Sequence, residues 1–225
     1  MSTALLASAP RATRVVHIAA DGASLTGELM VPDAPRGIVV FCRTNANGFL
    51  HRSDRFVAAT LRDAHFATVM FDLLTPEEEM IDASSGHLAT DLSRLARRLI
   101  DAIDWLALQP TVCALPIGLL GEGPGAAAAI VAACVRPSRV FAVVSRNGNV
   151  ERASPVFDRL CVPILLIANG NDDTAVRVNA SAFRRLRSTK ELVLVDGETP
   201  AGRRPPVDAT SNLIVDWLAR YVSSE

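Results

Sequence analysis

Short, continuously apolar runs alternate along this chain with longer segments in which apolar residues recur every three or four positions. The short runs are rich in Val, Ile and Leu, which is typical of parallel strands buried on both faces. They lie at 37–42, 67–73, 117–120, 139–145 and 163–168, and a last strand is predicted at 191–195. Segments 15–20 and 24–31 alternate in polarity around Asp21-Gly22, a turn pair that favours a hairpin.

The periodic segments predict helices between these strands. The strongest spans Leu88 to Gln109, where one apolar stripe faces the core and Arg94, Arg97, Arg98, Asp101 and Asp104 point elsewhere. A helix at 54–65 should bury Phe56, Val57, Leu61 and Ala64. Further helical segments are predicted to begin near 75, to end near 135, to end near 160 and to span 176–186. A final helix is predicted with Thr210 or Ser211 as its N-cap.

This order predicts an α/β fold. After an antiparallel N-terminal hairpin, strands and helices alternate, so the central sheet should be mostly parallel with helices on both faces. We expect one domain over 14–225, a frayed tail over 1–13, and no large lid, because the connection from Ser145 to Pro163 is short. A turn is expected at Asn147-Gly148-Asn149.

Composition narrows the class of protein. The chain has 225 residues, 49% of them apolar, and a net charge of −1, which argues against nucleic acid or an anionic membrane as a partner. No apolar run approaches the roughly 20 residues of a membrane span. The four cysteines have no Cys-x-x-Cys spacing, so we expect buried free thiols and a soluble cytoplasmic protein.

The motif most informative about function lies at 117–130. An apolar run ends at Gly121, Gly123 and Gly125 follow at alternate positions, and a helix of small residues begins. The frame is that of the G-x-S-x-G nucleophile elbow, a sharp turn between a strand and a helix. Gly123 stands where the serine would be.

Several motifs in order resemble the α/β-hydrolase fold, specifically the dienelactone-hydrolase-like group. Besides the elbow frame, they are residues 71–79 (Phe-Asp-Leu-Leu-Thr-Pro-Glu-Glu-Glu), 86–88, 104–106 and 143–146. The resemblance covers nearly the whole chain. It implies a nucleophile, an acid and a histidine in that chain order.

The chain departs from this pattern at several of its catalytic positions. Gly123 cannot form an acyl-enzyme, and Pro124 lacks the backbone N–H that would serve as one oxyanion donor. Pro200 stands where the resemblance places the histidine, and no histidine follows His87. Where the group carries His-Gly after its first central strand, the chain reads Cys42, Arg43, Thr44, Asn45. Asp173 matches the acid, although with no base to orient, capping of the next helix by Asp172 and Asp173 is the favoured interpretation.

A nucleotide site and a displaced nucleophile are less consistent with these residues. A dinucleotide loop at 121–126 is disfavoured, because no acid ends the next strand and Pro124 removes an amide that would face pyrophosphate. A Cys42–His51 pair is conceivable, but a buried thiol at a strand end is the commoner case. Ser145, beside Arg146, is expected to bond to the backbone.

Charged groups near the expected cleft give weaker indications. Glu77 to Glu79 with Asp82 fit a solvated acidic helix start better than a metal site. Arg43, His51 and Arg52 make the cleft mouth basic, which would suit an acidic ligand, and Glu122 would oppose an anion at the helix N-terminus.

The sequence therefore predicts a pseudo-hydrolase. Such a protein needs no cofactor or metal and would use the old cleft or a surface to bind a small molecule or a protein partner. The alternative is an esterase or dienelactone-type hydrolase with displaced catalytic groups, for which Cys42, His51, Ser145 and Asp173 are the candidates.

Overall fold

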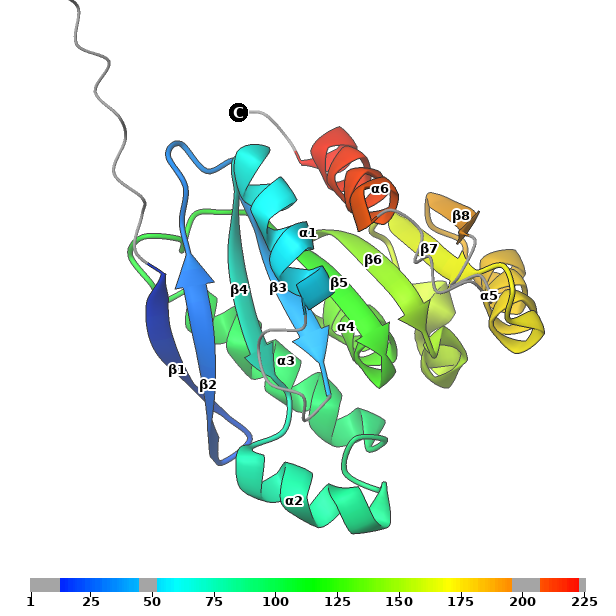
Figure 1. Ribbon diagram of the computed structural model, residues 1–225, viewed down its shortest axis with the longest axis horizontal. Coiled ribbons are helices and arrows are strands. Elements are labelled where there is room, and N and C mark those ends of the chain that lie inside the picture. Colours follow the sequence, from blue (N-terminus) through cyan, green and yellow to red (C-terminus); the bar gives the residue numbers. More distant parts are fainter. Residues whose placement is uncertain (1–12, 45–51, 196–206, 223–225) are drawn as a thin grey trace, which may run out of the picture.

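All eight described strands join in one twisted sheet with the order β1-β2-β4-β3-β5-β6-β7-β8 (Figure 1). The computed structural model describes residues 13–44, 52–195 and 207–222. The pairs β1–β2 and β2–β4 are antiparallel, and all later pairs are parallel. The strands are β1 (Arg14–Ala20), β2 (Ala23–Met30), β3 (Gly37–Arg43), β4 (Phe66–Asp72), β5 (Ile117–Gly123), β6 (Val140–Gly148), β7 (Ile164–Asn169) and β8 (Lys190–Val195). The predicted α/β fold, with its hairpin and mostly parallel sheet, is confirmed.

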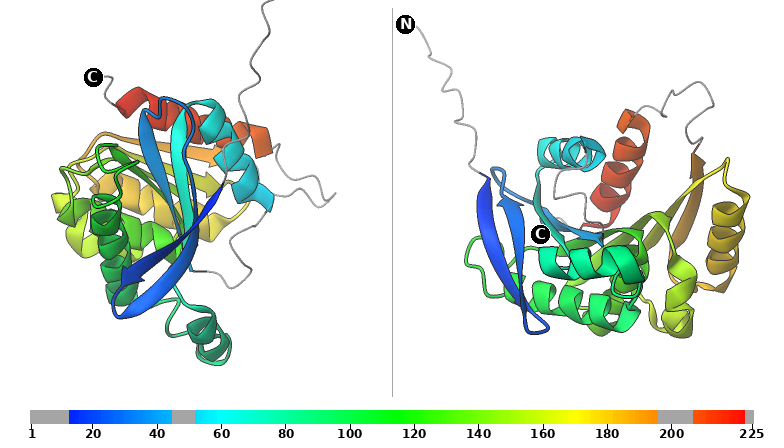
Figure 2. Two further views of the ribbon diagram at one scale, coloured as in Figure 1. Left: turned by 90° about the vertical axis from the view of Figure 1, so that its left-hand side faces the viewer. Right: turned by 60° about the horizontal axis from the view of Figure 1, so that its bottom comes forward.

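Helices cover both faces of the sheet, as predicted (Figure 2). On one face α3 (Leu92–Leu106), α4 (Pro124–Val135), the 3-10 helix η1 (Val150–Arg159) and α5 (Asp173–Arg185) enclose the larger apolar core. On the other, α1 (Arg52–Asp63) and α6 (Val207–Tyr221) enclose the smaller one. Every residue of β4 is buried, which explains why its sequence, apolar apart from Thr68 and the terminal Asp72, shows no alternation of apolar and polar residues.

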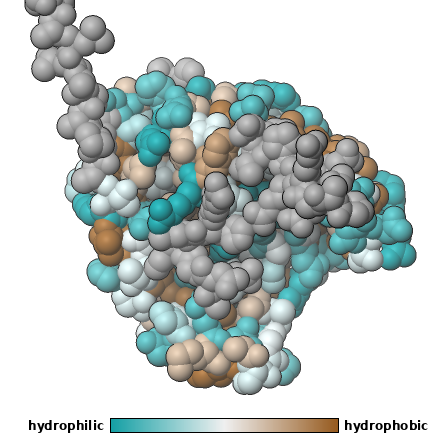
Figure 3. Space-filling model, in the orientation of Figure 1, coloured by the Kyte–Doolittle hydropathy of each residue, from teal (hydrophilic) through white to brown (hydrophobic). Residues whose placement is uncertain are grey.

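Helix α2 (Pro76–Ser85) projects from the body of the molecule and buries none of its residues. Its start is fixed by a capping box, in which the Glu78 N–H donates to Thr75 Oγ1 at 3.3 Å and the Thr75 N–H donates to Glu78 Oε2 at 2.9 Å. Its end is fixed by Asp82, which accepts hydrogen bonds from the Leu88 and Ala89 N–H groups. Met80 and Ile81 are exposed on it, and apolar surface is visible at this end of the molecule (Figure 3).

Several predicted details are wrong for identifiable reasons. The long helix starts at Leu92 rather than Leu88, because the Asp91 side chain caps it by accepting from the Arg94 N–H. Phe56 is exposed rather than buried. The final helix begins at Val207, ahead of the predicted caps.

The predicted turn at Asn147-Gly148-Asn149 is also wrong, because β6 continues to Gly148 through a positive φ of 49° at Asn147. Residues 1–12 of the predicted tail lie outside the described residues. Within the part of the chain that is described, no helix is long and apolar enough to cross a membrane.

Candidate functional site

The backbone of the elbow turns sharply at Gly123, the last residue of β5, with φ 52° and ψ −128°. A Cβ atom at this residue would meet no atom of the described residues within 4 Å, so there is space for it, although the dihedral angles disfavour it. At Gly121 a Cβ would collide with the Ala126 backbone, and at Gly125 with the Cys42 carbonyl. The outer glycines are therefore required by close packing, whereas the central one is required only by its dihedral angles.

A small pocket lies directly beside the elbow. It has a volume of about 40 Å³ and is lined by Arg43, Thr44, Glu122, Gly123 and Pro124. Pro124 is the first residue of α4, where its missing N–H costs the helix nothing. The described walls leave room for about one water or one small group at the position of the absent side chain.

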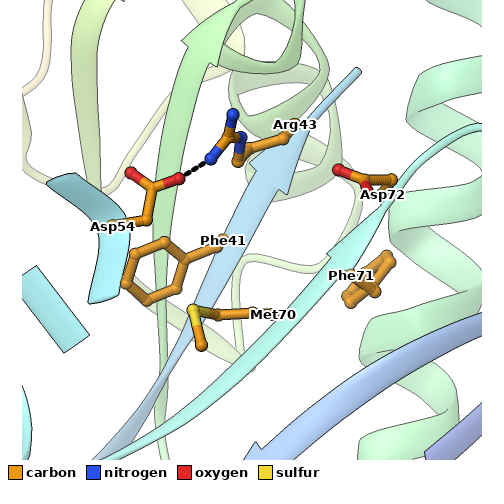
Figure 4. Close-up of a pocket in the computed structure, with 6 residues that line it drawn as sticks. All are labelled: Phe41, Arg43, Asp54, Met70, Phe71 and Asp72. Atoms are coloured by element: carbon orange, nitrogen blue, oxygen red, sulfur yellow. Dashed lines mark ion pairs between the residues drawn. The ribbon is translucent and has the colours of Figure 1, made fainter. Parts of the chain in front are cut away.

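A cluster of four charged side chains, of which all but Glu122 are largely buried, adjoins this pocket at the carboxyl edge of the sheet. Asp54, on α1, has a side chain that is 1% exposed and forms ion pairs with Arg43 of β3 and Arg146 of β6. Arg146 Nη2 also lies 2.9 Å from Glu122 Oε2 on β5. Figure 4 shows Arg43 reaching Asp54 across the strand end. We call Arg43, Asp54, Glu122 and Arg146 the elbow ion cluster.

This cluster corrects the prediction of a basic cleft mouth for Arg43 alone, because His51 and the side chain of Arg52 lie outside the described residues. The guanidinium groups of Arg43 and Arg146 are paired with Asp54 and Glu122, so neither is a solvated cation available to an acidic ligand. Asp54 was missed by the sequence analysis because nothing local distinguishes it from an ordinary acid in the first turn of a helix. The available signal was two arginines at the carboxyl ends of the buried strands β3 and β6, which flank β5, since such charges need partners.

Asp72 extends this charged region along the end of β4. It lines a narrow crevice together with Phe41, Arg43, Asp54, Met70 and Phe71 (Figure 4). Burial raises the pKa of the Asp72 carboxyl, although attraction to Arg43 opposes the shift. The pKa of Glu79 is raised as well, first by burial and then by repulsion from Asp72.

The two candidate displaced nucleophiles are enclosed. Cys42 is 0% exposed, its Sγ donates to the Val40 carbonyl at 3.5 Å, and burial raises the pKa of its thiol far above the usual range. Ser145 is 0% exposed, and it packs so closely that a Cβ on Gly148 would collide with its Oγ. Its Oγ has no hydrogen-bond partner within the described part of the chain, so the expected backbone bond is absent there.

Asp172 and Asp173 lie in the turn that matches the acid of the resembled family, and in the structure this turn caps a helix. Asp172 accepts hydrogen bonds from the N–H groups of Thr174 and Ala175 at 2.9 and 3.0 Å. Asp173 follows as the exposed first residue of α5. Asn45, His51 and Pro200, which include the candidate base and the histidine position, lie outside the described residues.

Within the acidic run on α2, Glu78 is not the solvated group that the sequence predicts, whereas Glu77 is exposed as expected. Glu78 forms ion pairs with Arg94 and Arg98, and Arg98, predicted to point away from the core, is 1% exposed. The Arg98 guanidinium also donates to the Leu73 carbonyl at 2.7 Å. No group of three acids, cysteines or histidines among the described residues is arranged to hold a metal ion.

Comparison with solved structures identifies a close relative of this architecture. The crystal structure of a dienelactone hydrolase from Anabaena variabilis ATCC 29413 matches with a TM-score of 0.88 at 34% identity, over 95% of this chain and 99% of the other. Est1E from Butyrivibrio proteoclasticus shares the fold at 13% identity, with a TM-score of 0.76 over 93% of this chain and 99% of the other.

Comparison with curated sequences gives two longer relatives. Proteins of Mycobacterium tuberculosis strains CDC 1551 and H37Rv, both provisionally named phosphoribosyl transferases, are 38% identical over 217 residues, which is 96% of this chain. The chain spans about half of their length, 48%. No family model matches. From the sheet order, the elbow turn and the 34% identity over its length, the chain belongs to the dienelactone-hydrolase-like group of α/β-hydrolase-fold proteins.

Proposed function

We propose that this protein is a non-catalytic member of its group, which uses the region around the elbow to bind a small ligand or a protein partner. The observation that carries the proposal is Gly123. It occupies the elbow turn, where a Cβ atom would meet none of the described residues, yet it supplies no nucleophile. Pro124 removes an oxyanion donor at the same turn, a loss that typically costs about 10²–10³ in rate.

The elbow ion cluster supports the same proposal. Arg146 joins Glu122, inside the elbow, to Asp54 on α1, so ion pairs hold the turn where the resemblance would place reacting groups. A buried charge that is already paired offers little to a reacting substrate, because recruiting it would leave its partner unpaired. The cluster therefore serves the architecture of the cleft, and a ligand at the adjoining pocket would meet Arg43 and Glu122 as groups that are already paired.

The alternative is a hydrolase that uses displaced groups. It requires a nucleophile and a base within hydrogen-bond reach of one another and of a substrate. Cys42 and Ser145, which would have to supply the nucleophile, are both fully buried. Their burial favours the non-catalytic proposal.

An activity screen separates the two. We expect wild-type protein to show neither fluorophosphonate labelling nor turnover of short-chain p-nitrophenyl esters, with a serine esterase of known activity as the positive control for the assay. Gly123→Ser should fold with a loss of about 1–3 kcal/mol from backbone strain and remain inactive, because its oxyanion site and base are still missing. Both chemistry and stability are read on the same purified samples, the stability by urea unfolding.

The displaced-hydrolase alternative has its own variants in the same screen. Cys42→Ala and Ser145→Ala remove its two candidate nucleophiles. Wild-type turnover that either substitution abolishes would overturn the non-catalytic proposal. Ester turnover that persists in both variants, and that remains after a second purification has removed contaminants, would also overturn the non-catalytic proposal.

The longer curated relatives indicate what kind of domain could be the partner of this chain. They carry about as much chain again as the region matched here, and their name describes a phosphoribosyl transferase. We infer that the transferase activity in that name belongs to the unmatched part, and that the fold of this chain serves as the companion of such a domain. The inference rests on the match between this chain and a hydrolase fold over 95% of its length.

Titration of this chain with phosphoribosyl diphosphate and Mg²⁺ tests that inference. Isothermal titration calorimetry should show no saturable binding up to millimolar ligand. Inorganic pyrophosphate serves as the matched control for non-specific anion binding. Saturable binding of phosphoribosyl diphosphate that pyrophosphate does not reproduce would place the ligand site within this chain and contradict the inference.

A further inference from the structure

Two of the four free cysteines lie at the same end of η1. Cys134 is in the last turn of α4 and is half-buried, whereas Cys161 is exposed in the connection between η1 and β7. The Cys134 Sγ donates to the Val156 carbonyl at 3.6 Å, and the Cys161 Sγ donates to the Arg159 carbonyl at 3.4 Å.

The two carbonyl acceptors are neighbours along one helix. They are three residues apart in η1, which is one turn of a 3-10 helix, or about 6 Å along the axis. Both sulfurs are therefore held on the C-terminal turn of the same short helix. Their proximity also appears in their electrostatics, since the pKa of Cys134, raised to about 11 chiefly by burial, is raised further by Cys161 and lowered by Arg159.

We propose that a peroxide converts Cys134 and Cys161 into an intrachain disulfide, which ties the end of α4 to the connection between η1 and β7. The exposed Cys161 thiolate reacts first, attacking one peroxide oxygen to give a sulfenic acid and releasing water or an alcohol. The Cys134 thiolate then attacks the Cys161 sulfur, forms the S–S bond and expels hydroxide, which is protonated to water. Two thiols are oxidised by two electrons, and one peroxide O–O bond is reduced.

The second step sets the pace of this reaction. Because only the thiolate is nucleophilic, a pKa of about 11 at Cys134 leaves little of the reactive form at neutral pH. Closure should accelerate about tenfold for each pH unit between 7 and 10. Arg159 and Cys161 are the groups that act electrostatically on Cys134, and a thiol reductant reverses the link.

A disulfide between Cys134 and Cys161 would restrain the helix that follows the elbow. The same helix α4 begins beside Gly123 and ends beside Cys134. A covalent link at its far end fixes the helix against η1, with which it shares the larger core. The proposal does not depend on the ligand or on the absence of catalysis.

The test is mass spectrometry of the intact, folded protein treated with hydrogen peroxide at pH 7, 8 and 9. We expect a single cross-linked peptide pair that joins Cys134 to Cys161, formed faster at higher pH, and a fall in thiols titrated after denaturation from four to two. Dithiothreitol should restore all four. Dimedone added at pH 7 should trap the sulfenic acid on Cys161 before closure.

Single substitutions decide the assignment. Cys134→Ser should raise dimedone labelling of Cys161 and abolish the cross-link, whereas Cys113→Ser, which removes another half-buried thiol, should leave the cross-link unchanged. The proposal fails if Cys161 pairs with Cys113 or with Cys161 of a second molecule in a non-reducing gel. It also fails if Cys161 advances to the sulfinic acid while Cys134 stays reduced.

Discussion

Replacing Asp54 with alanine should lower the free energy of unfolding by about 3–5 kcal/mol, because the substitution leaves buried positive charge without its counter-ion. Asp54 is 1% exposed and pairs with both Arg43 and Arg146, whose side chains are 11% and 10% exposed. Arg146 keeps Glu122 as a partner, so most of the cost falls on Arg43. Urea unfolding followed by circular dichroism measures the change.

The same helix supplies a matched control. Asp63, at the end of α1, has a side chain that is 80% exposed and lies 3.9 Å from Arg62. Asp63→Ala should change stability by no more than about 0.5 kcal/mol, as is usual for an exposed surface pair. If Asp54→Ala costs no more than Asp63→Ala, the elbow ion cluster is not structural, and its arginines would again be available to a ligand.

A double-mutant cycle distinguishes pairing from simple loss of packing. Arg43→Met should lower the free energy of unfolding much less in the Asp54→Ala background than in the wild type, because in that background the methionine removes a positive charge that Asp54→Ala has left unpaired. We expect a coupling of roughly 2–3 kcal/mol between the two residues. Additive losses would show that the ion pair itself contributes little.

The elbow could be predicted from the sequence because its determinants are local. An apolar run, three glycines at alternate positions and a helix of small residues are contiguous, and each has a separate physical cause in the structure. Gly121 and Gly125 are required by contacts with Ala126 and Cys42, and Gly123 by its positive φ. The buried strands were recognised for the same reason, since a sheet covered on both faces leaves uninterrupted apolar runs.

The ion pairs could not be predicted because their partners are distant in sequence. Arg146 and Asp54 are 92 residues apart, and Glu78 and Arg98 are 20 apart on different helices. Periodicity assigned Arg98 to a polar face of α3, yet its side chain is buried and pairs with Glu78 of α2. A pattern along one helix does not reveal which neighbour covers it.

The second large effect is at that α2–α3 contact, where Glu78→Gln should lower the free energy of unfolding at pH 7 by about 3 kcal/mol. Arg98 Nη2 lies 2.7 Å from Glu78 Oε1, and Arg94 Nη1 lies 2.8 Å from the same oxygen. Hydrogen bonds from Arg98 are the largest cause that lowers the pKa of Glu78 to about 2. Glutamine keeps the shape of the side chain but removes the charge that the buried Arg98 needs.

The direction of the pH dependence follows from that lowered pKa. The folded value, about 2, lies below the ordinary value of 4.5, so the carboxylate stabilises the fold fully above pH 4.5. That contribution falls as the pH drops from about 4.5 to 2, because the unfolded chain takes up the proton first. The difference between wild type and Glu78→Gln should therefore be largest at neutral pH and vanish near pH 2.

The difference between the two proteins is the quantity to measure, because other acids shift in the opposite direction. The raised pKa values of Asp72 and Glu79 make their protonation favour the folded state as the pH falls. These contributions are common to both proteins and cancel in the comparison. Urea unfolding at half-unit steps from pH 7 to pH 2 gives the full curve.

A surface ion pair provides the control for this curve. Glu151 and Arg185 are separated by 2.6 Å, but their side chains are 39% and 49% exposed. Glu151→Gln should therefore cost only about 0–1 kcal/mol, because solvent screens the pair.

A Glu78→Gln loss that is the same at pH 7 and pH 2.5 would mean that the side chain acts through packing or the helix cap rather than through its charge. A loss that declines between pH 4.5 and 2 assigns the effect to the buried guanidinium of Arg98, the contact that holds a helix with no buried residue of its own against the body of the protein.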